Sequence, residues 1–242
     1  MKRLLIILPA LSLILTGCFK EPIAEALITP NPAYVGEDIT FTNLSNNTNY
    51  VEWDLDDGNS SSEFKFIHYY YDPGRYDVTL KAFGERGGIN RASYIIDVVG
   101  SELKIIVKEV VDEYFVQGAS VVLYNTYDDW LNFENQIGEE QFTNSVGECL
   151  FTDLSYQRYY VDVWEANHDN WQLGEDNIDW IETQDLPGGY DHTFIAFVEY
   201  YETTEKKSLS TRPATRDFRA NLRTPGAPRV VKENKISEPK KK

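Results

Sequence analysis

The sequence has few of the residues that most often carry chemistry. It is 242 residues long and contains only two cysteines and three histidines. Two cysteines cannot build a disulfide-rich scaffold or a metal site with four thiolates. The H-E-x-x-H and G-x-S-x-G motifs are missing, and the glycine-rich stretch at residues 84–88 lacks the lysine of a phosphate-binding loop. We therefore expect no enzyme, no catalytic residue and no cofactor.

Long apolar runs and positive charge are also scarce in the body of the chain. No run of 18 apolar residues follows the N-terminal segment, so no membrane span is expected there. Residues 18–200 contain nine basic and 34 acidic residues, whereas residues 201–242 contain 12 basic and five acidic ones. Because nucleic-acid binding needs a basic surface, this composition argues against it for the folded domains but not for the tail.

The N-terminus reads MKRLLIILPALSLILTGC, with two basic residues before an apolar stretch and small Thr16 and Gly17 before Cys18. This arrangement resembles the lipobox of bacterial lipoproteins. The resemblance implies that residues 1–17 are a removed signal peptide and that acyl chains such as palmitate on Cys18 anchor the mature chain to a membrane. Residues 18–25 would then be a lipidated tether. An ordinary secretory signal with a chance cysteine is the alternative.

Residues 26–99 have the pattern of a β-sandwich, because short alternating segments are separated by clusters of Gly, Asn, Asp and Ser. Residues 53–58 (WDLDDG) are similar to the W-D-F-G-D-G signature of PKD domains. Residues 68–80 (HYYYDPGRYDVTL) are similar to that family's H-x-Y-x-x-P-G-x-Y-x-V-T-L stretch. The resemblance implies an immunoglobulin-like sandwich that serves as a spacer or interaction module. The sequence departs from the signature at Leu55 and Asp56, which puts the turn geometry in doubt.

Residues 102–201 contain a second series of β-patterned segments, with a short link at residues 128–133 that could be helical. Residues 118–124 (GASVVLY), 143–154 (TNSVGECLFTDL) and 159–163 (YYVDV) follow each other in the order of three recurrent motifs, G-A-x-V-x-L-Y, T-x-x-x-G-x-x-x-F-x-x-L and Y-Y-V-x-V. In these motifs the segment resembles the carboxypeptidase-regulatory-like, or transthyretin-like, β-sandwich. The resemblance implies no catalytic residues. An acidic insertion at residues 168–190 does not match that pattern. Residues 202–242 lack periodicity and contain four prolines, so we expect a disordered basic tail that contacts an anionic partner or lipid head groups.

Two kinds of binding site are considered in the folded part. Trp171, Trp180 and Tyr190 flank a loop rich in Asp, Asn and Gln, and such residues can stack on sugar rings and bind their hydroxyls. We therefore predict a glycan contact at these three residues, with a core role for Trp180 as the alternative. Clustered carboxylates at residues 54–57 and in the insertion could hold Ca²⁺, but turn chemistry is favoured and no metal ligand is predicted. Cys149 is expected to be a buried, inert thiol.

Together these features predict an all-β protein with two tandem β-sandwiches after a lipoprotein signal peptide. The modular style resembles envelope lipoproteins of Bacteroidota-type bacteria, which implies a lipid-anchored protein of the cell envelope, expected at the outer membrane. The predicted function is a non-catalytic structural or interaction module with a protein or glycan partner. The alternative is an accessory subunit of an envelope secretion, transport or polysaccharide-handling complex, docked through the basic tail.

Overall fold

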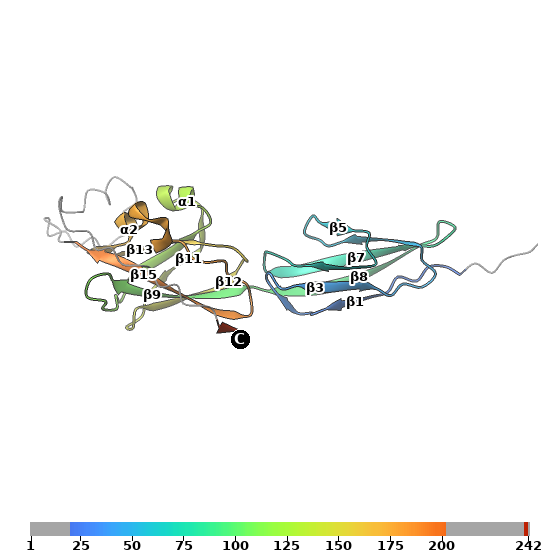
Figure 1. The fold of residues 1–242 in the computed structure, drawn as a ribbon, viewed down its shortest axis with the longest axis horizontal. Helices are drawn as coiled ribbons and strands as arrows, with labels where there is room; N and C mark the ends of the chain where they lie inside the picture. The colour runs from blue at the N-terminus through green and yellow to red at the C-terminus, as the bar shows by residue number, and fades with distance from the viewer. Residues whose placement is uncertain (1–19, 202–239, 242) are drawn as a thin grey trace, which may run out of the picture.

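A computed structural model describes residues 20–201 and 240–241 of the chain. The predicted signal peptide, Cys18 and nearly all of the predicted tail lie outside the described residues. The described chain is almost entirely β and forms two sandwiches arranged end to end (Figure 1). The predicted fold class is thereby confirmed. Within the described residues, no helix combines the length and the apolar character needed to cross a bilayer.

The N-terminal sandwich packs a three-stranded sheet, in the order β1-β3-β6, against a five-stranded sheet, in the order β2-β8-β7-β4-β5. Its core contains Trp53, Phe41 and Tyr70, each at most 1% exposed. The indole Nε1 of Trp53 donates a hydrogen bond to the carbonyl oxygen of Glu63, which satisfies the buried polar group. Its strands are β1 (Ala26–Thr29), β2 (Ala33–Tyr34), β3 (Ile39–Asn43), β4 (Tyr50–Asp54), β5 (Ser60–Ser61), β6 (Lys65–His68), β7 (Gly74–Phe83) and β8 (Ile89–Val99).

The second sandwich follows the strand order β11-β10-β13-β14-β15-β9-β12, with β16 added beside β15. Strands β9 and β15, the first long strand and the last long strand, pair in parallel along the core. The last two described residues, Lys240 and Lys241, pair with the start of β15. Its strands are β9 (Ser101–Glu109), β10 (Ser120–Tyr124), β11 (Gln136–Phe142), β12 (Glu148–Leu154), β13 (Tyr160–Glu165), β14 (His168–Asp169), β15 (Tyr190–Tyr200) and β16 (Lys240–Lys241).

Short helices cover the outer face of the second sandwich (Figure 1). They are α1 (Tyr127–Asn132), α2 (Trp171–Asp176) and the 3₁₀-helix η1 (Ile178–Trp180). Helix α1 confirms the predicted helical link, and the side chain of Thr126 caps it by accepting from the backbone N–H of Asp129. Helices α2 and η1 belong to the acidic insertion. Because the helices cover this face, every residue of β10 is buried. In a strand with one face open to solvent, buried and exposed residues would alternate.

The junction between the sandwiches is short and closely packed. Gly100 alone separates β8 from β9. The ring of Tyr156 from the second sandwich stacks on Tyr71 of the first, with centroids 5.9 Å apart, and its backbone N–H donates to the Tyr71 carbonyl oxygen at 2.7 Å. The hydroxyl of Ser155 donates to Asp72 at 2.7 Å. This combination of main-chain, side-chain and ring contacts holds the two sandwiches in one orientation.

Candidate interaction surfaces

The aromatic residues predicted to contact a glycan lie mainly in the interior. Trp171 is 2% exposed and its ring stacks on Trp130 with centroids 4.5 Å apart. Trp180 is 7% exposed and packs edge-to-face on Phe197. Tyr190 is half-buried at the start of β15. The prediction is therefore wrong for Trp171 and Trp180, because their rings hold α2 and η1 onto the sheet and offer no free face to a sugar.

The other residues considered for chemistry are the cysteines and histidines, and those that the structure describes have the surroundings of structural residues. Cys18 lies outside the described residues. Burial in the core of the second sandwich raises the pKa of the Cys149 thiol to about 12, so the reactive thiolate is disfavoured at neutral pH. His192 Nε2 contacts the carbonyl oxygen of Pro187, and His168 lies between Tyr114 and Glu165.

The carboxylates considered for Ca²⁺ form the β4–β5 turn. Asp54 and Asp57 each accept a hydrogen bond from a backbone N–H two residues further on, and Asp56 accepts from the N–H of Asp77 at 2.8 Å. Asp57 also contacts His68 Nε2 at 2.7 Å. Among the residues that the structure describes, no three His, Cys, Asp or Glu side chains come together in a way that could hold a metal ion. These carboxylates thus have the geometry of turn residues.

An open cleft lies on the outward face of β4 and β7, beside the β5 hairpin, with a volume of about 660 Å³. Tyr50 is 45% exposed, and its ring packs against that of Phe83 with centroids 5.2 Å apart. Glu52 accepts from the Tyr50 hydroxyl and lies 3.7 Å from the ammonium group of Lys81. Asn59 and the hairpin residues Ser60, Ser61 and Ser62 also line the cleft. We call this the outer-face cleft. It combines an exposed aromatic ring with carboxylate, amide and hydroxyl groups.

A second groove runs along the edge of the same sandwich, between β5 and β6, with a volume of about 350 Å³. These are the outermost strands of their respective sheets. Tyr69, Tyr71 and Ile67 line the groove, and Tyr71 and Ile67 are more than half exposed. The hydroxyl groups of Tyr69 and Tyr71 lie 2.9 Å apart. Strand β5 therefore separates two grooves, of which this one is the more apolar.

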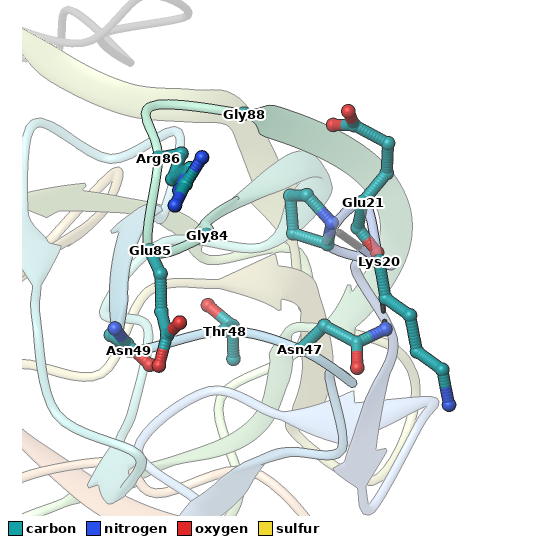
Figure 2. A pocket seen from close by; sticks show the side chains of 10 residues that line it. Lys20, Glu21, Asn47, Thr48, Asn49, Gly84, Glu85, Arg86 and Gly88 are labelled. Carbon is teal, nitrogen blue, oxygen red and sulfur yellow. Dashed lines mark hydrogen bonds between the residues drawn. The ribbon is translucent and has the colours of Figure 1, made fainter. Parts of the chain in front are cut away.

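A third cleft lies where the chain enters the first sandwich, with a volume of about 500 Å³ (Figure 2). Three segments form it: residues 20–22, the turn at residues 47–49 and the turn at residues 84–88. The amide of Asn47 donates to the Glu21 carbonyl oxygen at 3.1 Å, and Thr48 donates to the carbonyl oxygen of Phe83 at 3.0 Å. We call this the N-terminal cleft. It is lined by polar and charged side chains of both signs.

Glycine at residue 88 allows the segments of the N-terminal cleft to approach each other. A Cβ atom at this position would lie 2.5 Å from the Glu21 carboxylate and 3.0 Å from the ring of Pro22. Gly84 N donates to the Gly88 carbonyl oxygen at 2.9 Å and closes the turn. The cleft is therefore fixed by the backbone and does not depend on long side chains.

Comparison with known proteins identifies the first sandwich. Residues 20–98 match the family model of the PKD domain, which confirms that part of the prediction. A search of the curated proteins returned no match. The transthyretin-like assignment of the second sandwich stays a prediction.

Several solved structures are similar to parts of the chain. The PKD1 domain of Vibrio anguillarum Epp is 23% identical, with 33% of this chain and 94% of that chain covered and a TM-score of 0.29. A structure of carbohydrate-binding modules from the beta-sandwich superfamily is 17% identical over 60% of this chain and 58% of that one, with a TM-score of 0.34. The major pilin subunit BcpA of Bacillus cereus is 11% identical over 75% and 71%, with a TM-score of 0.32. At these values the likenesses carry no functional argument.

The sequence analysis missed all three clefts. One signal was present for the outer-face cleft, because the alternation in β4 places Tyr50, Glu52 and Asp54 on the face opposite the buried Trp53. The other walls of that cleft come from a two-residue strand without a readable pattern. The N-terminal cleft is formed by three segments that are distant in sequence, so no local sequence motif could predict it.

Proposed function

We propose that this chain is a lipid-anchored lipoprotein of the cell envelope whose two sandwiches form a stiff, non-catalytic arm. The observation that carries the proposal is the closely packed junction. A linker of one residue, main-chain hydrogen bonds and the Tyr71–Tyr156 stack oppose bending between the domains. An anchor on Cys18 would attach to the PKD domain at the pole opposite this junction (Figure 1). The second sandwich would then project away from the membrane.

The outer-face cleft supports a saccharide as the partner of the PKD domain. Sugars present C–H faces that stack on aromatic rings and hydroxyl groups that pair with carboxylates and amides. Tyr50 supplies the exposed ring, while Glu52, Asp54 and Asn59 supply the polar groups. Tyr50, Glu52 and Asp54 all lie on β4, which is paired on both sides within a five-stranded sheet, so these three groups are positioned before a ligand arrives.

Glycan binding by the full mature chain tests this assignment. On a glycan array we expect binding that is lost in Tyr50→Ala and retained in Tyr50→Phe, because the phenyl ring preserves stacking. Tyr200→Ala is the matched control, since Tyr200 is also about half exposed but lies on the second sandwich. Absence of any glycan ligand, or equal loss in Tyr200→Ala, would contradict a saccharide site at Tyr50.

Metabolic labelling tests the anchor separately. Radiolabelled palmitate should be incorporated into the wild-type chain and not into Cys18→Ser. Label in both proteins, or in neither, would show that Cys18 is not the lipidated residue. Because this experiment does not involve the clefts, its result is independent of the glycan array.

A further inference from the structure

The groove between β5 and β6, which we call the edge groove, runs along an open strand edge. The backbone N–H of Asn43 donates to the Phe64 carbonyl oxygen at 2.8 Å, just before β6 begins. In an antiparallel pair only every second residue bonds to the neighbouring strand. Phe66 therefore bonds to β3, whereas Lys65 and Ile67 direct their backbone N–H and C=O groups away from it, toward the open edge.

The other edge of the same sheet is covered. Strand β1 and the residues before it lie beside β8, where the Ala26 N–H donates to the Tyr94 hydroxyl at 2.7 Å and the Ala24 N–H to the Asn90 amide oxygen at 2.9 Å. Among the described residues, the outward backbone groups of Ile67 have no such partner. An open row of N–H and C=O groups is a template on which another strand can pair.

Beyond β6 the edge groove is lined by tyrosines that are already packed together. The rings of Tyr69 and Tyr71 have centroids 5.1 Å apart, and their hydroxyl groups lie 2.9 Å apart. Tyr156 of the second sandwich stacks on Tyr71 and holds it in place, yet Tyr71 is 56% exposed. Exposed tyrosines held by their neighbours are typical of the residues that supply most of the binding energy in protein interfaces.

The charges beside the edge groove are negative. Asp57 contacts His68, which lines the groove. The pKa of Tyr69 is raised by its hydrogen bond with the neighbouring tyrosine and, to a smaller extent, by the charge of Asp38. Lys65, the basic residue of β6, does not line the groove. A segment that carries Lys or Arg would therefore be attracted, and its cationic side chains also suit the faces of tyrosine rings.

We infer that the edge groove binds an extended, basic segment of a partner protein, which adds to the first sandwich as a strand beside β6. The backbone groups of Lys65 and Ile67 would bond to the backbone of the segment, and alternate side chains of the segment would face the groove. One of its cationic side chains would lie against Tyr69 and Tyr71. The inference depends neither on the lipid anchor nor on the saccharide site, because β5 separates the edge groove from the outer-face cleft.

Binding of a peptide to the full mature chain carrying Cys18→Ser tests the inference. The probe is a short fluorescent peptide in which valine and arginine alternate, and binding is followed by fluorescence anisotropy. N-methylation of all its valines, or of all its arginines, blocks hydrogen bonding along one edge only. Because a strand bonds to β6 through every second residue, one methylated peptide should bind like the parent and the other about tenfold more weakly. Equal affinity of the two methylated peptides, or no binding of the probe, would overturn the inference.

Hydrogen exchange locates the contact on the domain. In the free chain the amides of Lys65 and Ile67 should exchange rapidly, and they should gain protection when the peptide is added. Strand β1, the covered edge, should not change. Protection of the two amides before any peptide is added would show that another part of this chain, or a second copy, already occupies the edge. That result would overturn the assignment of the groove to a partner protein.

Two variants complete the test. Ile67→Lys places a cation on the open edge, where it should repel a basic strand and weaken binding of the probe about tenfold or more. Ile89→Lys makes the same change at the start of β8 and should bind like the parent. The two isoleucines are 63% and 48% exposed, so thermal unfolding should be unchanged in either variant. Equal affinity of the two variants for the probe would show that the edge groove is not the site.

Discussion

The two sandwiches place their tryptophans differently. In the PKD domain, Trp53 lies between the two sheets, where strand alternation directs it. In the second sandwich, Trp130, Trp171 and Trp180 lie outside the sheets, beneath α1, α2 and η1. The first domain is thus a two-layer structure with one core, whereas the second gains an additional layer on its outer face.

The additional layer depends on packing, because its helices are too short to be stable alone. Helices α1 and α2 have six residues each, well below the length at which an isolated helix is stable in water. The stacked rings of Trp130 and Trp171 hold them to the outer face of β10 and β13. The acidic insertion is therefore a structural cover, and its negative charge lies on the solvent side of buried aromatic rings.

The largest expected effect comes from removing that packing. Trp171→Ala should destabilise the second sandwich by about 3–5 kcal/mol, because a fully buried indole is lost and a cavity remains. Hydrogen exchange followed by mass spectrometry should show lost protection in α1, α2 and β10. The PKD domain should keep its protection. Trp53→Ala is the matched variant, with the opposite pattern, and equal loss in both domains would contradict two separate cores.

An intermediate effect is expected at the junction. Gly36 has φ of +73°, and a Cβ atom there would lie 2.7 Å from the Tyr156 ring. Gly36→Ala should cost about 2–4 kcal/mol through backbone strain and overpacking together. Hydrogen exchange at Tyr156 and small-angle scattering should show a looser junction.

Gly58 provides the control for this substitution. Its φ is +85°, and a Cβ atom there would have no neighbour within 4 Å. Gly58→Ala therefore tests backbone strain alone and should cost about 1–2 kcal/mol without changing the junction. If the two variants had the same stability and the same scattering profile, the Tyr156 contact would not hold the domains together.

The contrast between the domains also explains what could be predicted from the sequence. The PKD domain has motifs of local origin: Trp53 follows strand alternation, and residues 56–58 form the expected turn, with Asp56 itself at φ of +63°. The cover of the second sandwich has no such pattern. A helix of one to two turns is too short to show a helical periodicity in the sequence. The tryptophans of the insertion could therefore be interpreted only from their polar neighbours, which are the residue types of a sugar-binding site. Only the fold shows that the sheet beneath them needs covering.

The smallest effect concerns the contact between Asp57 and His68 within the PKD motif. Burial alone raises the pKa of Asp57, but hydrogen bonds from the amide and backbone N–H of Asn59 and the contact with His68 outweigh it, so the pKa lies below its ordinary value. A lowered carboxyl pKa stabilises the fold above the unfolded value, near 4, and this contribution is lost as the pH falls through the folded value. Solvent screening limits it to at most about 1 kcal/mol.

Asp57→Asn should therefore reduce the loss of unfolding free energy that the PKD domain shows as the pH falls from 7 to 3. The stability of the second sandwich should be unaffected. Urea unfolding measured between pH 7 and pH 3, with hydrogen exchange to separate the domains, gives the comparison. Asp38→Asn, an exposed carboxylate of the same domain, is the control and should follow the parent. If both variants changed the pH dependence of the unfolding free energy equally, the overall charge, and not the Asp57–His68 contact, would determine the loss of stability in acid. A change in the second sandwich would mean that the junction couples the domains more strongly than their separate cores suggest.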